Sequence, residues 1–273
     1  MPATTLSSAE GELGQVTVDA FLGGRVEAVQ PACGHHRAGL EAVLLAASVP
    51  TRQRGTVVDL GAGVGVVGFC IAARCVDAQV ILVERDEIAT MCASAAMGRT
   101  QNSDFAGRVK IVETDIVARE DLSVGKAEAV VFNPPFYRSD AATASPSPSR
   151  AGAHILEVNG LDPWFRAAAA LARPGGTATI IFRADGLDSV IAAAAGRFGG
   201  LDLLPIAPRS EEPAHRILVR GIKGSRAPLR LLPPLVLHGT GNAFRPEIDA
   251  ILRGGAELSA VIPYWNIDRN RTS

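Results

Sequence analysis

The chain has 273 residues, 47% of them hydrophobic, and a formal net charge of −1 at pH 7. A chain of this length can bury one substantial core, so we expect one α/β domain with extensions. No apolar run reaches the roughly 20 residues that span a bilayer, which excludes a membrane-spanning helix. The balanced charge argues neither for nor against RNA binding.

The spacing of cysteine and histidine residues narrows the class of protein. The four cysteines form no Cys-x-x-Cys pair; they are Cys33, Cys70, Cys75 and Cys92. Zinc ribbons and redox motifs are therefore not indicated. His35 and His36 have no third ligand at metal-like spacing, and residues 1–10 lack the basic and apolar regions of a secretory signal. We expect a reduced, cytoplasmic protein without a metal.

The first patterned segment covers residues 19–47. Residues 19–25 read Asp-Ala-Phe-Leu-Gly-Gly-Arg, which predicts a β-hairpin. A glycine-, histidine- and arginine-containing turn over residues 34–39 then leads into the apolar run of residues 40–47, which predicts a helix.

Residues 56–65 read Thr-Val-Val-Asp-Leu-Gly-Ala-Gly-Val-Gly, and an apolar stretch of helical length follows over residues 66–73. This order predicts the strand, tight turn and helix that open a Rossmann-like unit. The glycines let the backbone turn sharply and come close to a bound nucleoside. Because NAD enzymes and methyltransferases both use such loops, the glycines alone do not separate the two classes.

Acidic residues follow successive predicted strands. Asp59 stands two positions before Gly61, where a carboxylate repels a pyrophosphate and suits a cationic ligand. Glu84 stands 23 residues after Gly61 and can accept hydrogen bonds from both ribose hydroxyls. Asp115 follows the strand predicted over residues 108–112 and either accepts an adenine amino group or caps the next helix. These acids are expected to line the carboxyl ends of parallel strands, where open α/β sheets bind ligands.

Asn133-Pro134-Pro135-Phe136 follows the strand predicted over residues 128–132. The Asn133 side-chain carbonyl can accept a hydrogen bond from an exocyclic NH2 group. Two prolines remove backbone donors, so the Pro134 carbonyl can be held as a second acceptor. Phe136 offers a flat face for ring stacking. Alone, the tetrapeptide is also compatible with a proline-stiffened loop.

The remaining elements continue the α/β pattern. The Ser-, Ala- and Pro-rich residues 139–152 predict a loop that can close over a substrate. Asp162-Pro163 predicts the start of a helix, with Asp162 as its N-cap, that ends before a strand over residues 177–182. The later elements are a helix over 187–198, strands over 201–206 and 216–220, an extended arm over 231–238 and a short helix over 246–253.

This order of parts over residues 51–223 resembles the class I S-adenosylmethionine-dependent methyltransferases, in the branch with Asn/Asp-Pro-Pro-aromatic that methylates exocyclic amines. Residues 19–47 resemble the start of the tRNA (adenine-N6) methyltransferases that modify the adenine beside the anticodon of a valine tRNA. Leu40 departs from that pattern, because many relatives carry Thr there. The resemblance implies an α/β fold with a Rossmann-like, seven-stranded and mostly parallel sheet, a C-terminal antiparallel hairpin and helices on both faces.

The resemblance also implies a reaction and a site. The cofactor is S-adenosyl-L-methionine, and the acceptor is N6 of a flipped adenine in tRNA. The implied catalytic residues are Asn133, Pro134, Pro135 and Phe136. The implied cofactor-binding residues are Arg37, Gly39, Asp59, Gly61, Ala62, Gly63, Gly65, Glu84, Asp115 and Asn133. The expected division is residues 1–50 as a hairpin and first helix over the site, 51–223 as the cofactor-binding domain, and 224–273 as an extension packed on it.

Basic residues gather late in the chain. Six of them stand between residues 209 and 230 against Glu211 and Glu212, and they are Arg209, Arg216, Arg220, Lys223, Arg226 and Arg230. They are interpreted either as a phosphate-binding surface for tRNA or as strand-edge charges that discourage edge pairing.

Other functions remain open from the sequence. A glutamine amide in a protein such as a release factor offers the same NH2 geometry, but Phe136 and the lack of a long helical N-terminal domain count against it. Guanine N2 in ribosomal RNA fits the motif, although such proteins often carry a duplicated domain that this chain lacks. A non-catalytic partner subunit is disfavoured by the intact motif, and an NAD-dependent oxidoreductase by Asp59.

Overall fold

The computed structural model describes residues 15–33, 37–116, 126–135 and 160–266. His35, His36, Phe136 and the predicted loop over residues 139–152 lie outside these ranges, so the predictions made for them stay predictions.

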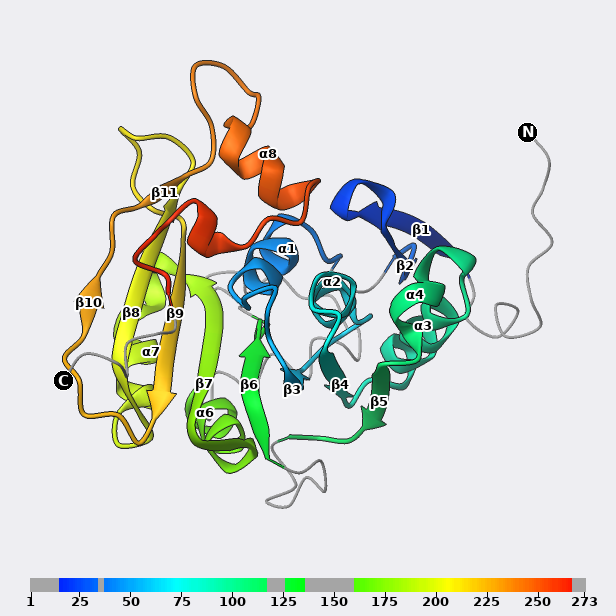
Figure 1. Cartoon of the computed structure of the whole chain (residues 1–273), viewed down its shortest axis with the longest axis horizontal. Coiled ribbons are helices and arrows are strands. Elements are labelled where there is room, and N and C mark those ends of the chain that lie inside the picture. The colour runs from blue at the N-terminus through cyan, green and yellow to red at the C-terminus, as the bar shows by residue number, and fades with distance from the viewer. Residues whose placement is uncertain (1–14, 34–36, 117–125, 136–159, 267–273) are drawn as a thin grey trace, which may run out of the picture.

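A nine-stranded sheet forms the centre of the molecule, in the order β10-β8-β9-β7-β6-β3-β4-β5, with β11 also paired to β8 (Figure 1). The five strands of its parallel part are β3 (Gly55–Leu60), β4 (Ala78–Glu84), β5 (Val109–Glu113), β6 (Ala127–Phe132) and β7 (Ala172–Arg183). β9 (Arg216–Lys223) runs antiparallel to both β7 and β8 (Phe198–Ala207). The predicted parallel sheet with an antiparallel C-terminal hairpin is therefore confirmed.

The segment predicted as an extended arm adds two short strands to the edge of this sheet. β10 (Arg230–Leu231) and β11 (Leu235–Val236) both pair in parallel with β8. They extend the sheet beyond the seven strands that the sequence predicted.

Helices cover both faces of the sheet, as predicted (Figure 1). One apolar cluster joins the sheet to α1 (Leu40–Ala47), α2 (Val66–Arg74), α3 (Glu87–Met97), α4 (Ser103–Ala106) and α8 (Pro246–Leu252). The other cluster joins it to α6 (Asp162–Leu171) and α7 (Leu187–Ala194). Val57 packs in the first cluster and Val58 in the second, because successive side chains of a strand point to opposite faces.

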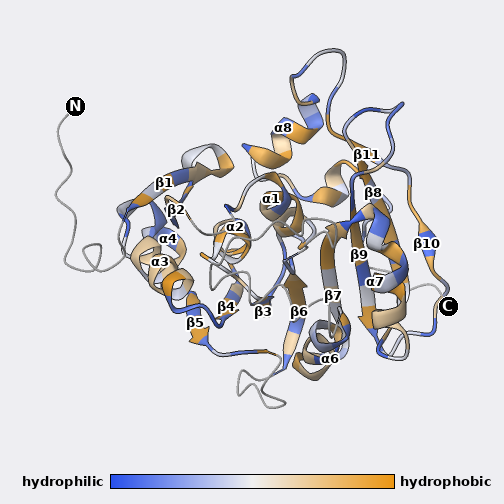
Figure 2. Ribbon diagram, turned by 180° about the vertical axis from the view of Figure 1, so that it is seen from behind, coloured by the Kyte–Doolittle hydropathy of each residue, from blue (hydrophilic) through white to orange (hydrophobic). Residues whose placement is uncertain are grey.

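Burial on both faces explains the composition of the strands. The central strands carry mostly hydrophobic residues (Figure 2). In β6, for example, Val130, Val131 and Phe132 are fully buried. Parallel strands buried on both faces read as nearly continuous apolar runs. Within the described ranges, no helix is both long and apolar enough to cross a membrane.

Two predicted helix ends need correction. Leu161, and not Asp162, is the N-cap of α6; the Asp162 carboxylate instead pairs with Arg166 at 2.6 Å and with Arg197 at 2.7 Å. α7 ends at Ala194, because Gly196 adopts φ +75° and turns the chain into β8. The N-cap of α3 is Asp86, whose side chain accepts a hydrogen bond from the Ala89 amide.

The N-terminal hairpin is present as β1 (Val16–Phe21) and β2 (Val26–Pro31). Two arginines, one in this hairpin and one in α2, bond to the C-terminal extension. Arg25 Nη2 donates to the Gly254 carbonyl, and the buried Arg74 donates to the carbonyls of Gly255 and Ala46. Both extensions therefore pack on the same core, while the domain boundaries at residues 50 and 223 stay a prediction.

Candidate active site

The ends of three neighbouring strands lie at the same level of the sheet. Leu60, the last residue of β3, lies opposite Val83 of β4 and Phe132 of β6. The residues that follow these three positions are Gly61, Glu84 and Asn133. The register of the sheet thus brings the glycine loop, the ribose-binding candidate and the Asn-Pro-Pro motif to one edge, as the sequence predicted.

The glycine loop is fixed to β4 and open at its centre. The amides of Gly61 and Ala62 donate to the Val83 carbonyl at 2.8 and 3.0 Å. Gly61, Gly63 and Gly65 have φ values of +69°, +55° and +88°, which only glycine adopts without strain. A Cβ atom at Gly63 would meet no atom within 4 Å. The middle of the loop therefore leaves room for a ligand to approach the backbone.

Glu84 braces the glycine loop, which the sequence did not predict. Its Oε2 accepts a hydrogen bond from the Gly63 amide at 2.7 Å. Its Oε1 accepts from the amides of Arg85 and Asp86 at 2.8 and 2.9 Å. A carboxylate has about four acceptor positions, so binding both hydroxyls of a ribose requires that Glu84 give up one of these bonds.

Asp59 is buried beneath the loop and does not line an open site. It is 1% exposed, and its Oδ2 accepts a hydrogen bond from the Gly68 amide of α2 at 2.9 Å. Burial raises the pKa of Asp59 to about 7, against the lowering effect of the Gly68 bond, and the charge of Glu84 adds to the rise. The sequence analysis predicted that Asp59 binds a cationic ligand, but direct contact does not fit this burial. Asp59 can act on such a ligand only through its charge.

The pKa of Asp59 predicts how stability changes with pH. Since the folded-state pKa of about 7 exceeds the ordinary 3.8, the folded protein holds a proton over this window that the unfolded chain releases. The free energy of unfolding therefore falls as the pH rises from about 4 to 7, by at most about 4 kcal/mol.

Asp59→Asn is expected to remove this contribution, because the amide does not titrate. Urea unfolding of both proteins at pH 5, 6, 7 and 8 measures it. A smaller pH dependence in the variant is the expected result, and identical pH profiles would contradict the assignment.

Asn133 carries an unsatisfied acceptor at this edge. Its Oδ1 is buried and has no hydrogen-bond partner among the described residues. Leaving such a group without a partner costs about 1–3 kcal/mol, so its presence calls for an explanation. Pro134 is buried and Pro135 is exposed. The arrangement offers an oxygen acceptor to an incoming N–H donor.

Three other predicted residues have partners within the protein. Arg37 donates to Thr17 Oγ1 at 3.0 Å and pairs with Asp19, so the hairpin holds it. The Gly39 carbonyl accepts from the Ala42 amide at the start of α1. Asp115 pairs with Arg85 at 3.4 Å, beside Glu84 at the end of β4.

Glu41 and Trp164 were missed by the sequence analysis. Glu41 Oε1 pairs with Arg216 Nε at 2.6 Å, and Arg216 lies opposite Arg183 at the end of β7, which places α1 over the same sheet edge. Trp164 packs against Gly61. Neither contact has a local sequence signal, because each joins residues more than 100 positions apart.

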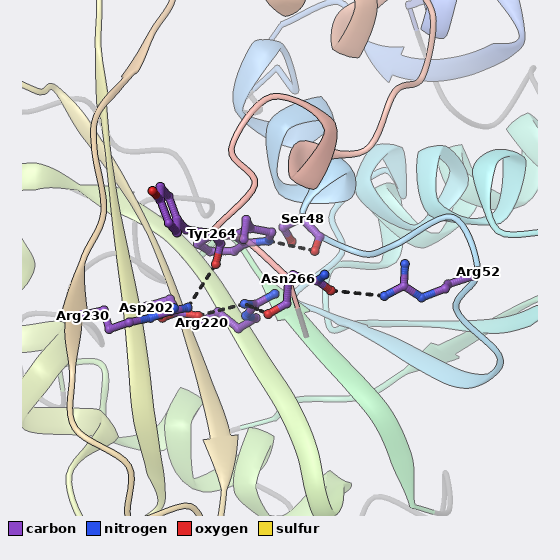
Figure 3. A network of polar contacts seen from close by, with 8 residues as sticks. Ser48, Arg52, Asp202, Arg220, Arg230, Tyr264 and Asn266 are labelled. Atoms are coloured by element: carbon purple, nitrogen blue, oxygen red, sulfur yellow. Dashed lines mark hydrogen bonds and ion pairs between the residues drawn. The ribbon is translucent and has the colours of Figure 1, made fainter. Parts of the chain in front are cut away.

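Arg220 does not fit the first of the two interpretations of these basic residues, a phosphate-binding surface. It is 3% exposed, and its Nη2 pairs with Asp202 Oδ2 at 2.8 Å (Figure 3). Its guanidinium lies 4.5 Å from the ring centroid of Trp265. Arg230 pairs with the other oxygen of Asp202 at 2.8 Å and donates to the Tyr264 carbonyl. The buried Asp202 requires opposite charge, which explains why these arginines face inward.

The other basic residues of this set are also held within the protein, apart from the exposed Arg226. Arg209 donates to the Gly241 carbonyl at 2.9 Å. Lys223 donates to the carbonyls of Ala169 and Ala172 at 2.5 and 2.8 Å, and desolvation lowers its pKa. The Lys223 contacts connect β9 to α6 and β7, and the Arg209 contact connects two loops. No cluster of three His, Cys, Asp or Glu residues suited to a metal occurs in the part of the chain that the structure describes.

The arrangement agrees with what comparisons with known proteins find. Residues 34–160 match the model of the methyltransferase small domain family. The tRNA1(Val) (adenine(37)-N6)-methyltransferase of Serratia proteamaculans is 28% identical over 67% of this chain and 69% of its own, and that of Bacteroides fragilis is 27% identical over 67% and 76%.

Two solved methyltransferase structures are similar to this chain. A crystal structure from Agrobacterium tumefaciens, described as a predicted O-methyltransferase, is 34% identical, covers 79% of this chain and 97% of its own, and has a TM-score of 0.67. The methyltransferase subunit of a type I restriction-modification system from Streptococcus thermophilus, 12% identical with a TM-score of 0.51, shares the fold alone. This chain belongs to the class I S-adenosylmethionine-dependent methyltransferases.

Proposed function

We propose that this protein methylates N6 of an adenine in tRNA, the reaction named for its Serratia and Bacteroides relatives. The observation that carries the proposal is the buried Oδ1 of Asn133, which has no partner among the described residues and lies one strand away from the glycine loop. An exocyclic amine supplies the N–H donor that this oxygen lacks.

The Asn-Pro-Pro segment holds the amine in this proposal. Asn133 Oδ1 and the Pro134 carbonyl accept hydrogen bonds from the two N–H groups of the amine. These bonds turn its nitrogen toward the glycine loop. The adenine nitrogen is a weak nucleophile because its lone pair is delocalised into the ring. Positioning therefore supplies most of the rate enhancement, which reaches roughly 7–11 kcal/mol in favourable cases. Phe136 stacks on the base after the base leaves its neighbours.

The residues around the loop fit S-adenosylmethionine, which supplies the sulfonium methyl group when it is bound. Gly61, Ala62, Gly63 and Gly65 form a backbone surface that is open at Gly63. Glu84 would accept hydrogen bonds from the ribose hydroxyls in exchange for one of its backbone contacts, and Asp115 would accept one from the adenine amino group. When it is ionised, Asp59 adds a negative charge that favours the cationic cofactor over its neutral product.

A hydroxyl acceptor is the second candidate, because the Agrobacterium structure is described as a predicted O-methyltransferase. A hydroxyl offers one hydrogen, whereas Asn133 and Pro134 together offer two carbonyl acceptors. That difference favours an amine. A tRNA acceptor also places the proposed reaction in the cytoplasm. The proposed division keeps residues 1–50 as the segment that caps the site and residues 224–273 as an extension packed on the same domain.

Unmodified transcripts of tRNA1(Val) with either adenine or guanine at position 37 test the proposal. The adenine transcript is expected to take label from S-adenosylmethionine, and the guanine transcript is expected to remain unlabelled. Equal labelling of both transcripts would place the methyl group on another nucleotide. Label on N2 of guanine in the guanine transcript would favour that alternative acceptor.

A further inference from the structure

Trp164 lies against the first glycine of the loop. A Cβ atom added to Gly61 would come within 2.4 Å of Cη2 and 2.6 Å of Cζ3 of Trp164. These distances mean that the edge of the indole ring is packed directly on the Gly61 backbone. The ring thus limits how far the loop can move toward α6.

The same ring stacks on the residue that precedes Asn133. The rings of Trp164 and Phe132 have centroids 6.2 Å apart and planes inclined by 20°. Phe132 is fully buried, and Phe165 packs edge-on against it at 5.2 Å. One indole therefore contacts the backbone at the end of β3 and the last side chain of β6.

The position of Trp164 is itself fixed by the start of α6. Pro163 lies in the first turn of the helix, and the Phe165 amide donates to the Leu161 carbonyl at 3.1 Å. Asp162 pairs with Arg166 and Arg197. Trp164 is 9% exposed. It is a rigid spacer and not a mobile surface side chain.

We propose that Trp164 is a positioning residue that sets the separation between the glycine loop and Asn133. The inference rests on the proposed function, since it assumes that the loop holds the methyl donor and Asn133 the acceptor amine. In-line transfer depends on the distance between the two, and an error of about 1 Å can lower the rate about 100-fold. Trp164 acts through Gly61 and Phe132 and touches neither reactant.

Kinetics of Trp164→Ala and Trp164→Phe test this role. Trp164→Ala is expected to lower kcat at least about tenfold, with the Kd for S-adenosylhomocysteine changed less than about threefold. Trp164→Phe keeps an aromatic spacer and is expected to restore most of kcat. The matched control is Trp265→Phe, which alters the chain's other tryptophan, also buried but bonded to Ser48.

A kcat loss in Trp164→Ala no larger than in Trp265→Phe, after correction for the folded fraction by thermal unfolding, would overturn the proposal. A loss of kcat that Trp164→Phe does not restore would also overturn it.

Fluorescence separates this inference from the identity of the substrate. In the Trp265→Phe protein, Trp164 is the only tryptophan, and its emission is expected to change saturably as S-adenosylhomocysteine is added. In the Trp164→Phe protein, the emission of the remaining Trp265 is expected to stay constant as S-adenosylhomocysteine is added. A saturable response with no methylation of tRNA would refute the proposed substrate and support the contact between Trp164 and the loop. No response from Trp164, with binding shown by calorimetry, would contradict the proposal that Trp164 is coupled to the loop that holds the methyl donor.

Discussion

Asn133→Ala is expected to lower kcat by at least about 10²–10³-fold, the loss typical when one electrostatic contact to a reacting group is removed. The side-chain oxygen that is lost is buried at the end of β6 and has no partner among the described residues. The glycine loop and Glu84 lie on β3 and β4 and remain intact, so the affinity for S-adenosylmethionine is expected to change little. Single-turnover methyl transfer and calorimetric binding measure the two quantities separately.

Asn133→Asp is the matched control for this prediction. It keeps the size of the side chain and an oxygen acceptor, and it is expected to retain more activity than the alanine variant. If both variants lost cofactor binding to the same extent as turnover, Asn133 would have to be assigned to the cofactor site and not to the acceptor amine.

Asp202→Ala has the largest expected effect on stability. The variant leaves Arg220, which is 3% exposed, without the carboxylate that pairs with it at 2.8 Å, and it also removes the carboxylate that pairs with Arg230. Breaking a buried ion pair from one side costs about 3–5 kcal/mol, because the remaining charge stays buried without compensation. Urea unfolding followed by circular dichroism measures the change in the free energy of unfolding.

An exposed ion pair provides the comparison. Arg253 and Asp249 pair at 2.7 Å on α8 with side chains that are 73% and 44% exposed, and Asp249→Ala is expected to cost less than about 1 kcal/mol. A second control, Asp202→Leu combined with Arg220→Met, replaces both charges and is expected to recover stability relative to Asp202→Ala. Equal stability of the Asp202→Ala and Asp249→Ala proteins would refute the view that the Asp202 network stabilises the sheet.

Local patterns were sufficient to predict most of the strands of the central sheet. The run of residues 56–65 predicts a strand and a turn because its apolar β-branched residues stop at three glycines, all with positive φ. Glu84 and Asn133 were placed correctly because the ends of parallel strands meet at one edge. These signals lie within about ten residues and do not depend on tertiary contacts.

Contacts between distant residues were not predictable in the same way. Arg220 looks like an exposed strand residue in the sequence, but Asp202 on the neighbouring strand draws it inward. Asp59 reads as a ligand contact, yet the Gly68 amide binds it inside the protein. The packing of Trp164 on Gly61 depends on how α6 meets β3, which no sequence period encodes.

Methyl transfer from labelled S-adenosylmethionine to unmodified total tRNA, with a parallel protein-acceptor reaction and mass spectrometry of both digests, tests the central claim most directly. The predicted result is N6-methyladenosine in the tRNA digest of the wild-type reaction and at least about 100-fold less in the same time with Asn133→Ala. N2-methylguanosine in the RNA, or label in the protein digest alone, would contradict the claim.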